Sequence, residues 1–172
     1  MSAPLNLHAQ NRKEVFTEIE KYLADLKFDI ISRDFERPWG GFFVINERQA
    51  KAFAEKFFPG VAIDDLKISG KLSPKILVVQ PESRLSWQYH FRRAEIWRVV
   101  SGKVGVTLSD TDEEVRMIEL DPGETIRLAQ GERHRLRGLR NWGVVAEIWQ
   151  HTDIHHPSDE QDIVRVQDDF GR

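Results

Sequence analysis

The chain has 172 residues, a formal net charge of −3 and no cysteine. This length suits one domain with a single core. The 25 basic and 28 acidic residues are mixed and form no basic tail or stripe, so we expect neither nucleic acid nor an anionic membrane as a partner. The sequence has no recognisable signal peptide and no long apolar run, and we therefore expect a cytoplasmic protein.

The N-terminal part, residues 1–64, predicts a helical extension with strands that join a barrel. From Asn11, a suitable N-cap, apolar residues recur at helical spacing as far as Leu26 and indicate an amphipathic helix. The other expected elements of this part are extended segments over residues 28–35 and 37–45 and a second helix over residues 47–57.

The remainder, residues 65–172, predicts short strands separated by Pro, Gly, Ser and Asp, a rhythm typical of an all-β sandwich or barrel. The strands are expected at residues 75–80, 85–91, 95–100, 103–108, 115–120, 125–128, 134–137 and 144–150. We predict that both parts form one compact domain, with the two helices packed outside the barrel.

Four side chains with metal-binding chemistry fall among these strands. Gln88 and His90 are two residues apart, so on a strand they leave the same face. Glu95 follows after four residues and is expected on the return strand of a hairpin, turned toward that face. His134 comes just after a turn at Gln130-Gly131 and would add a fourth donor. This donor set suits one divalent metal, with zinc first and iron, manganese, cobalt or nickel as alternatives.

The spacing of these four residues resembles the two signature motifs of the cupin superfamily. The first motif covers residues 88–102 and the second covers residues 123–134. Gln88 stands where the first motif usually has a histidine, and Ala129 stands where the second usually has a proline. The resemblance implies an all-β double-stranded β-helix, the jelly-roll barrel.

The glutamine narrows the resemblance to the cupin domain of type II mannose-6-phosphate isomerases, which is often fused to a mannose-1-phosphate guanylyltransferase. Here we expect a standalone version of that domain. The departures at Phe91, Arg92 and Ile96, where the family usually has histidines, spare the ligands but fall where side chains could tune the metal or contact the substrate. The blocks that carry the resemblance are Arg37-Pro-Trp-Gly40, Leu85-Ser86, Arg93-Ala-Glu95, Trp97, Val99-Val-Ser-Gly102, His134-Arg-Leu136, Asp162-Ile-Val-Arg165 and Asp168-Asp-Phe-Gly-Arg172.

The resemblance implies a metal-dependent isomerase that interconverts an aldose phosphate and a ketose phosphate through a cis-enediol. The metal would polarise the oxygens at carbons one and two, and a general base would move the proton between those carbons. Glu147, a carboxylate within an apolar strand, and Lys75, at the position of a family lysine, are the two candidate bases. The side chains expected to bind the sugar phosphate are Arg37, Trp39, Arg93, Arg135, Arg165 and Arg172.

Two other functions stay open from the sequence. One is a non-catalytic cupin that binds a sugar or sugar nucleotide in polysaccharide metabolism, which the missing histidines favour. The other is an Fe(II) dioxygenase, against which the glutamine ligand argues.

Assembly and the chain's end give two further expectations. We expect a homodimer, because the open sheet edges of such barrels invite pairing. We also expect residues 162–172 to pack on the barrel near residues 37–40, because their apolar side chains give this end a surface that can dock.

Overall fold

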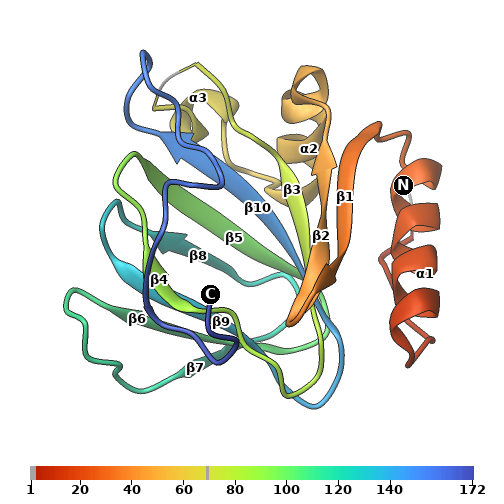
Figure 1. The fold of residues 1–172 in the computed structure, drawn as a ribbon. Coiled ribbons are helices and arrows are strands. Elements are labelled where there is room, and N and C mark those ends of the chain that lie inside the picture. The colour runs from red at the N-terminus through yellow and green to blue at the C-terminus, as the bar shows by residue number, and fades with distance from the viewer. Residues whose placement is uncertain (1–2, 69) are drawn as a thin grey trace.

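The computed structural model describes residues 3–68 and 70–172; residues 1 and 2, at the start of the predicted extension, and residue 69 lie outside the described part. Two antiparallel sheets face one another as a barrel, and the longer helices lie outside it (Figure 1). The helices are α1 (Arg12–Asp25), the 3-10 helix η1 (Glu47–Gln49), α2 (Ala50–Phe57) and α3 (Ile63–Leu66). The strands are β1 (Ile30–Arg37), β2 (Gly40–Ile45), β3 (Lys75–Val79), β4 (Trp87–Tyr89), β5 (Arg93–Ser101), β6 (Val104–Ser109), β7 (Ile118–Leu120), β8 (Thr125–Leu128), β9 (Arg133–Gly138), β10 (Gly143–His151) and β11 (Val164–Gln167).

The strand order confirms the predicted all-β barrel. The larger sheet has six strands in the order β1-β2-β3-β10-β5-β8, and the smaller has five in the order β11-β4-β9-β6-β7. Each strand predicted from the sequence is present, although β4 and β7 are shorter than expected. The N-terminal strands β1 and β2 extend the six-stranded sheet beside β3.

The predicted hairpin between the strands of Gln88 and Glu95 is wrong. Gln88 lies on β4 in the five-stranded sheet, whereas Glu95 lies on β5 in the six-stranded sheet. The short loop between them therefore crosses from one sheet to the other, and Glu95 approaches His90 across the barrel interior. Residue spacing alone does not distinguish a return within one sheet from a crossing to the sheet that faces it.

The centre of the six-stranded sheet is buried on both faces, which explains why all nine residues of β10 are buried, whereas the edge strands β1 and β8 are partly exposed. On the outer face, Ile96 of β5 belongs to a core that includes Val15 of α1 and Phe53 of α2. On the inner face, Trp97 of β5 and Leu77 of β3 belong to a second core inside the barrel. Alternate residues of one strand thus serve two different environments.

The first helix begins where the sequence indicates. The side chain of Asn11 accepts a hydrogen bond from the backbone N–H of Glu14 at 3.0 Å and so caps α1. The apolar face of α1 is buried at Val15, Phe16, Ile19 and Leu23. Within the described residues, no helix is long and apolar enough to cross a membrane.

The C-terminal run forms an unpredicted strand. β11 pairs antiparallel with β4, with Val164 opposite Tyr89 and Arg165 opposite Gln88. Beyond it, Asp169 accepts two hydrogen bonds from Arg84 at 2.7 and 2.9 Å. This end of the chain is therefore part of the barrel wall beside the strand that carries Gln88.

Candidate metal centre and its cavity

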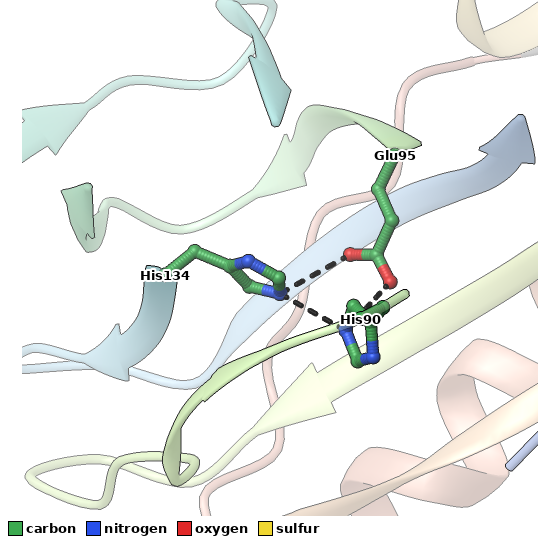
Figure 2. Close-up of side chains that lie close together, drawn as sticks. All are labelled: His90, Glu95 and His134. Carbon is green, nitrogen blue, oxygen red and sulfur yellow. Dashed lines mark hydrogen bonds and ion pairs between the residues drawn. The ribbon is translucent and has the colours of Figure 1, made fainter. Parts of the chain in front are cut away.

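Three of the predicted ligands converge inside the barrel. His90 follows β4, Glu95 lies on β5 and His134 lies on β9, and each is at most 2% exposed. The Nε2 atoms of the two histidines are 3.2 Å apart. Glu95 brings one carboxylate oxygen to 3.3 Å from the Nε2 of His90 and the other to 3.6 Å from that of His134 (Figure 2). These atoms form a group that could hold a metal ion.

Backbone carbonyls fix which nitrogen of each histidine faces the centre. The Nδ1 of His90 lies 2.6 Å from the carbonyl oxygen of Asp162, and the Nδ1 of His134 lies 3.0 Å from that of Glu132. A carbonyl oxygen only accepts hydrogen bonds, so each Nδ1 carries the proton and donates it. Each neutral imidazole therefore directs the lone pair of Nε2 toward the other. A cation between the rings would relieve this opposition of lone pairs.

The donors fit a metal ion in chemistry and in spacing. A tetrahedral ion with bonds of about 2.1 Å would separate its ligand atoms by about 3.4 Å, close to the distances between these three side chains. In addition, Oε2 of Glu95 is fully buried and has no hydrogen-bond partner among the described residues. A buried carboxylate oxygen without a donor is costly unless a cation contacts it.

Burial and neighbouring charges keep the two histidines and Glu95 in the protonation states that bind a metal ion. Burial lowers the pKa of His90 to about 4, and it also lowers the pKa of His134, so both rings are neutral near pH 7. Burial, the largest single effect, would raise the pKa of Glu95, but the charge and hydrogen bond of Arg93 together with the two neighbouring histidines outweigh it and keep that pKa below its ordinary value. Neutral imidazoles and an ionised carboxylate are the forms that bind metal.

Arg93 is built into the same centre. Its guanidinium donates to Oε1 of Glu95 at 2.7 Å and lies 3.2 Å from the Nε2 of His90. It also stacks over the ring of Trp149 at 3.6 Å and donates to the hydroxyl of Ser158 at 2.8 Å. The side chain is 5% exposed, so these contacts fix both the charge and the orientation of the Glu95 carboxylate.

Gln88 lies on the wall of the adjoining cavity, directly opposite His134 in the register of β4 and β9. Its side-chain oxygen accepts a hydrogen bond from the hydroxyl of Ser86 at 2.5 Å. That oxygen retains a second lone pair, and Gln88 as the fourth ligand stays a prediction.

Glu147 and Lys75 face this cavity from neighbouring strands. They are opposite one another in the register of β10 and β3. The indole N–H groups of Trp97 and Trp149 donate to the two oxygens of Glu147 at 2.7 and 2.8 Å. Burial, followed by the negative charge of Glu95, raises the pKa of Glu147 above its ordinary value. Lys75 lies over the Trp149 ring at 4.0 Å and forms an ion pair with Glu160.

Besides Arg93, three guanidinium groups line the same cavity. Arg37 forms an ion pair with Asp34 at 2.9 Å, and Arg172 forms one with Asp168 at 2.9 Å. Arg165 differs, because it forms no ion pair with an acidic side chain among the described residues, and its Nε, like that of Arg37, is buried without a hydrogen-bond partner there. Burial, followed by the positive charge of Arg172, lowers its pKa. The cavity thus holds a cation whose donors are not all used by the protein.

Of the remaining predicted substrate-binding residues, two line the cavity and one lies outside it. Trp39 lines the cavity with the three arginines, as does Arg93. Arg135 lies outside it: its guanidinium donates to the carbonyl oxygen of Leu85 at 2.9 Å and contacts Glu114 and Gln167. Arg135 is therefore the one predicted substrate-binding residue that lies outside this cavity lining.

The three departures from the family pattern also lie outside the cavity lining. Phe91 is 58% exposed and packs edge-to-face with Tyr89. Arg92 donates to the carbonyl oxygen of His156, and Ile96 belongs to the outer core beneath the helices. None of these side chains lines the cavity beside the metal centre.

Sequence reasoning missed three residues that the long segment after β10 brings to the site. Glu160 lines the cavity, while Ser158 and Asp162 contact Arg93 and His90. Ser158 lies in a polar link with no periodic pattern, so nothing in the sequence singled it out. Asp162 had one signal, its place in the closing block of the family resemblance.

The sequence matches one known protein family. Residues 46–168 match the family described as "Mannose-6-phosphate isomerase C-terminal". The chain belongs to this family. It is 32% identical over 114 residues to xanthan biosynthesis protein XanB of Xanthomonas campestris pv. campestris (strain B100), covering 66% of this chain and 23% of XanB. It is 27% identical over 161 residues to mannose-1-phosphate guanylyltransferase ManC of Salmonella typhimurium, covering 93% of this chain and 28% of ManC. The chain thus spans about a quarter of the length of these relatives.

Solved structures agree with the cupin fold. Lactobacillus farciminis oxalate decarboxylase superposes with a TM-score of 0.55 at 14% identity, over 80% of this chain and 34% of that one. The capsular polysaccharide assembling protein CapF of Staphylococcus aureus gives 0.53 at 14% identity, over 88% and 40%. Identities this low bear on the fold alone.

Proposed function

We propose that this protein is a metal-dependent sugar-phosphate isomerase of the mannose-6-phosphate type, which interconverts an aldose phosphate and a ketose phosphate. The observation that carries the proposal is one cavity that joins three different chemistries. Its lining includes Glu95 of the metal-ligand group, a buried carboxylate at Glu147 and an incompletely paired guanidinium at Arg165. Membership in the isomerase family supports the same reaction class.

The metal would be one divalent ion bound by His90, Glu95 and His134, with Gln88 as the fourth ligand. Two imidazoles with oxygen donors suit zinc first, and iron, manganese, cobalt or nickel are alternatives. Such an ion, once bound, would act as a Lewis acid on the oxygens at carbons one and two of the sugar.

Glu147 is the better placed of the two candidate bases. Its raised pKa brings a carboxyl group nearer to neutrality, where a general base works best. The two indole donors hold both oxygens in place, so proton transfer between carbons one and two would not require the side chain to reorient. Lys75, stacked on Trp149 and paired with Glu160, has contacts that suit a cation and would stabilise negative charge at the cis-enediol.

Arg165 is the proposed main contact for the phosphate. A phosphate offers several strong acceptors and would satisfy the unused donors of this guanidinium bidentately. Arg37 and Arg172, already balanced by aspartates, would add positive potential at the same side of the cavity. Trp39 offers an aromatic surface for the sugar ring.

The positions of the family departures favour an enzyme over a non-catalytic sugar-binding cupin. The replaced histidines lie outside the cavity lining, so they do not change the residues proposed to act on the substrate. Loss of activity would therefore need a further cause beyond Phe91, Arg92 and Ile96.

The test is metal analysis followed by a coupled isomerase assay across aldose phosphates of five to seven carbons. We expect turnover with at least one sugar phosphate, and a loss of kcat of at least about 100-fold in Glu147→Gln. Glu119→Gln, an exposed carboxylate on β7, serves as the control and should retain activity. Full metal occupancy without turnover on any sugar phosphate would overturn the isomerase and point to the non-catalytic binding protein.

A further inference from the structure

One buried carboxylate has no part in the proposed reaction, yet it joins the C-terminal segment to the metal centre. The side chain of Asp162 is completely buried. Its Oδ1 accepts the backbone N–H of Phe91 and its Oδ2 accepts that of Arg92, both at 3.0 Å. Oδ2 also accepts the hydroxyl of Ser158 at 2.6 Å. The carboxylate therefore caps the loop that immediately follows His90.

The same residue touches His90 directly through its backbone. The carbonyl oxygen of Asp162 accepts the Nδ1–H of His90 at 2.6 Å. Ser158, which donates to the Asp162 carboxylate, in turn accepts from Arg93, whose Nε binds Glu95. One segment thus reaches two of the three metal-binding side chains.

We propose that Asp162 is a positioning residue of the metal centre. Its carboxylate anchors the backbone of Phe91 and Arg92, and this anchor keeps its own carbonyl against the Nδ1 of His90. The imidazole is thereby held in the tautomer whose Nε2 faces Glu95 and His134. This inference rests on the metal site of the proposed function.

The proposal depends on how residues that hydrogen-bond to a metal ligand affect that ligand. A ligating histidine works best when its second nitrogen donates to a fixed acceptor, because this contact sets both the tautomer and the ring orientation. Here the acceptor is a main-chain carbonyl that no substitution removes. Its position, however, depends on a side chain that can be changed. Loss of the Asp162 carboxylate would free the carbonyl to move from His90.

A matched control lies in the same segment. The carboxylate of Asp153 also accepts two backbone N–H groups, those of His155 and His156 at 2.9 and 3.1 Å, but among the described residues no contact joins it to the metal centre. Asp153→Ala therefore removes a similar cap without the proposed positioning effect. Comparing it with Asp162→Ala separates general order in the segment from the specific hold on His90.

The experiment measures zinc affinity by competition with a chelating dye, and the tautomer of His90 by ¹⁵N NMR of the full chain. We expect Asp162→Ala to bind zinc about 10- to 100-fold more weakly, with His90 shared between its two tautomers. Asp153→Ala should match the wild type in both measurements. Asp162→Asn keeps one acceptor oxygen for the loop and should fall between the two.

Defined results would overturn the proposal. Wild-type zinc affinity in Asp162→Ala would do so, as would an equal loss in Asp153→Ala. If Asp162→Ala does not fold, Asp162→Asn decides, and unchanged affinity there overturns the proposal. A wild-type protein that binds no zinc would instead contradict the metal site of the proposed function, while the tautomer measurement would still show whether Asp162 holds His90.

Discussion

Replacing Arg165 by methionine should weaken anion binding without destabilising the fold. Methionine keeps an unbranched apolar stem and removes the charge. The Nε of Arg165 is buried without a hydrogen-bond partner among the described residues, and the neighbouring charge of Arg172 opposes it. The folded protein therefore loses little that is favourable when this guanidinium is removed.

The size of both effects follows from these contacts. A hydrogen bond to a charged group contributes about 1.5–3 kcal/mol, so losing the proposed phosphate contact should weaken binding about 10- to 150-fold. A buried donor left unpaired costs about 1–3 kcal/mol. Because Arg165 is only half-buried, we expect Arg165→Met to raise the free energy of unfolding by about 1 kcal/mol, the lower end of that cost.

Calorimetric titration with inorganic phosphate and with mannose 6-phosphate would measure the affinity, and urea unfolding would measure the stability. Arg84→Met is the control, since Arg84 is paired with Asp169 outside the cavity lining. It should leave anion affinity unchanged and cost at most about 1 kcal/mol of stability. Wild-type anion affinity in Arg165→Met, or an equal loss in Arg84→Met, would refute the role of Arg165 as the phosphate contact.

Four further outcomes are expected. His134→Ala should lower metal occupancy sharply in elemental analysis of reloaded protein, because a strong nitrogen ligand is lost; unchanged stoichiometry would contradict its role. Removing the metal by chelation should lower the melting temperature in calorimetry, since free metal at 100 times Kd stabilises by about 2.7 kcal/mol; identical melting curves would contradict this. Because burial raises the pKa of Glu147, the folded state holds that proton more tightly than the unfolded state. Wild-type stability should therefore fall relative to Glu147→Gln as pH rises from the ordinary carboxyl pKa toward the raised one, and parallel pH profiles would contradict the shift. Light scattering at micromolar concentration should give a homodimer, which a monomeric mass would rule out.

The side chains of the candidate metal centre were predictable because their spacing is a local property. On an extended chain, Gln88 and His90 leave the same face whichever sheet they join. The crossing of Glu95 to the opposite sheet was not predictable, because the connection's length allows a hairpin or a crossing. The sequence therefore predicted which residues form the centre. Only the structure showed that they come from both sheets of the barrel.

Alternation also explains the one predicted substrate contact that lies elsewhere. His134 faces the interior, so its neighbour Arg135 must leave the opposite face of β9. Arg165 is opposite Gln88 in the register of β4 and β11, and it shares the side of the sheet that faces the cavity. The sequence supports the first inference by itself. The second required the tail to be recognised as a strand, and its charged composition concealed this.

The alternation of side chains along a strand also shows that one departure from the family, Ile96, points away from the cavity. On β5, Glu95 and Trp97 face the cavity, whereas Ile96 between them faces the outer core. An isoleucine there adjusts packing under the helices and leaves the cavity side unchanged. Glu147 and Arg165, in contrast, place a carboxyl group and a guanidinium where burial is unfavourable. Such groups are costly in the folded state unless a ligand or a reaction uses them, so their presence together in this cavity favours a working site.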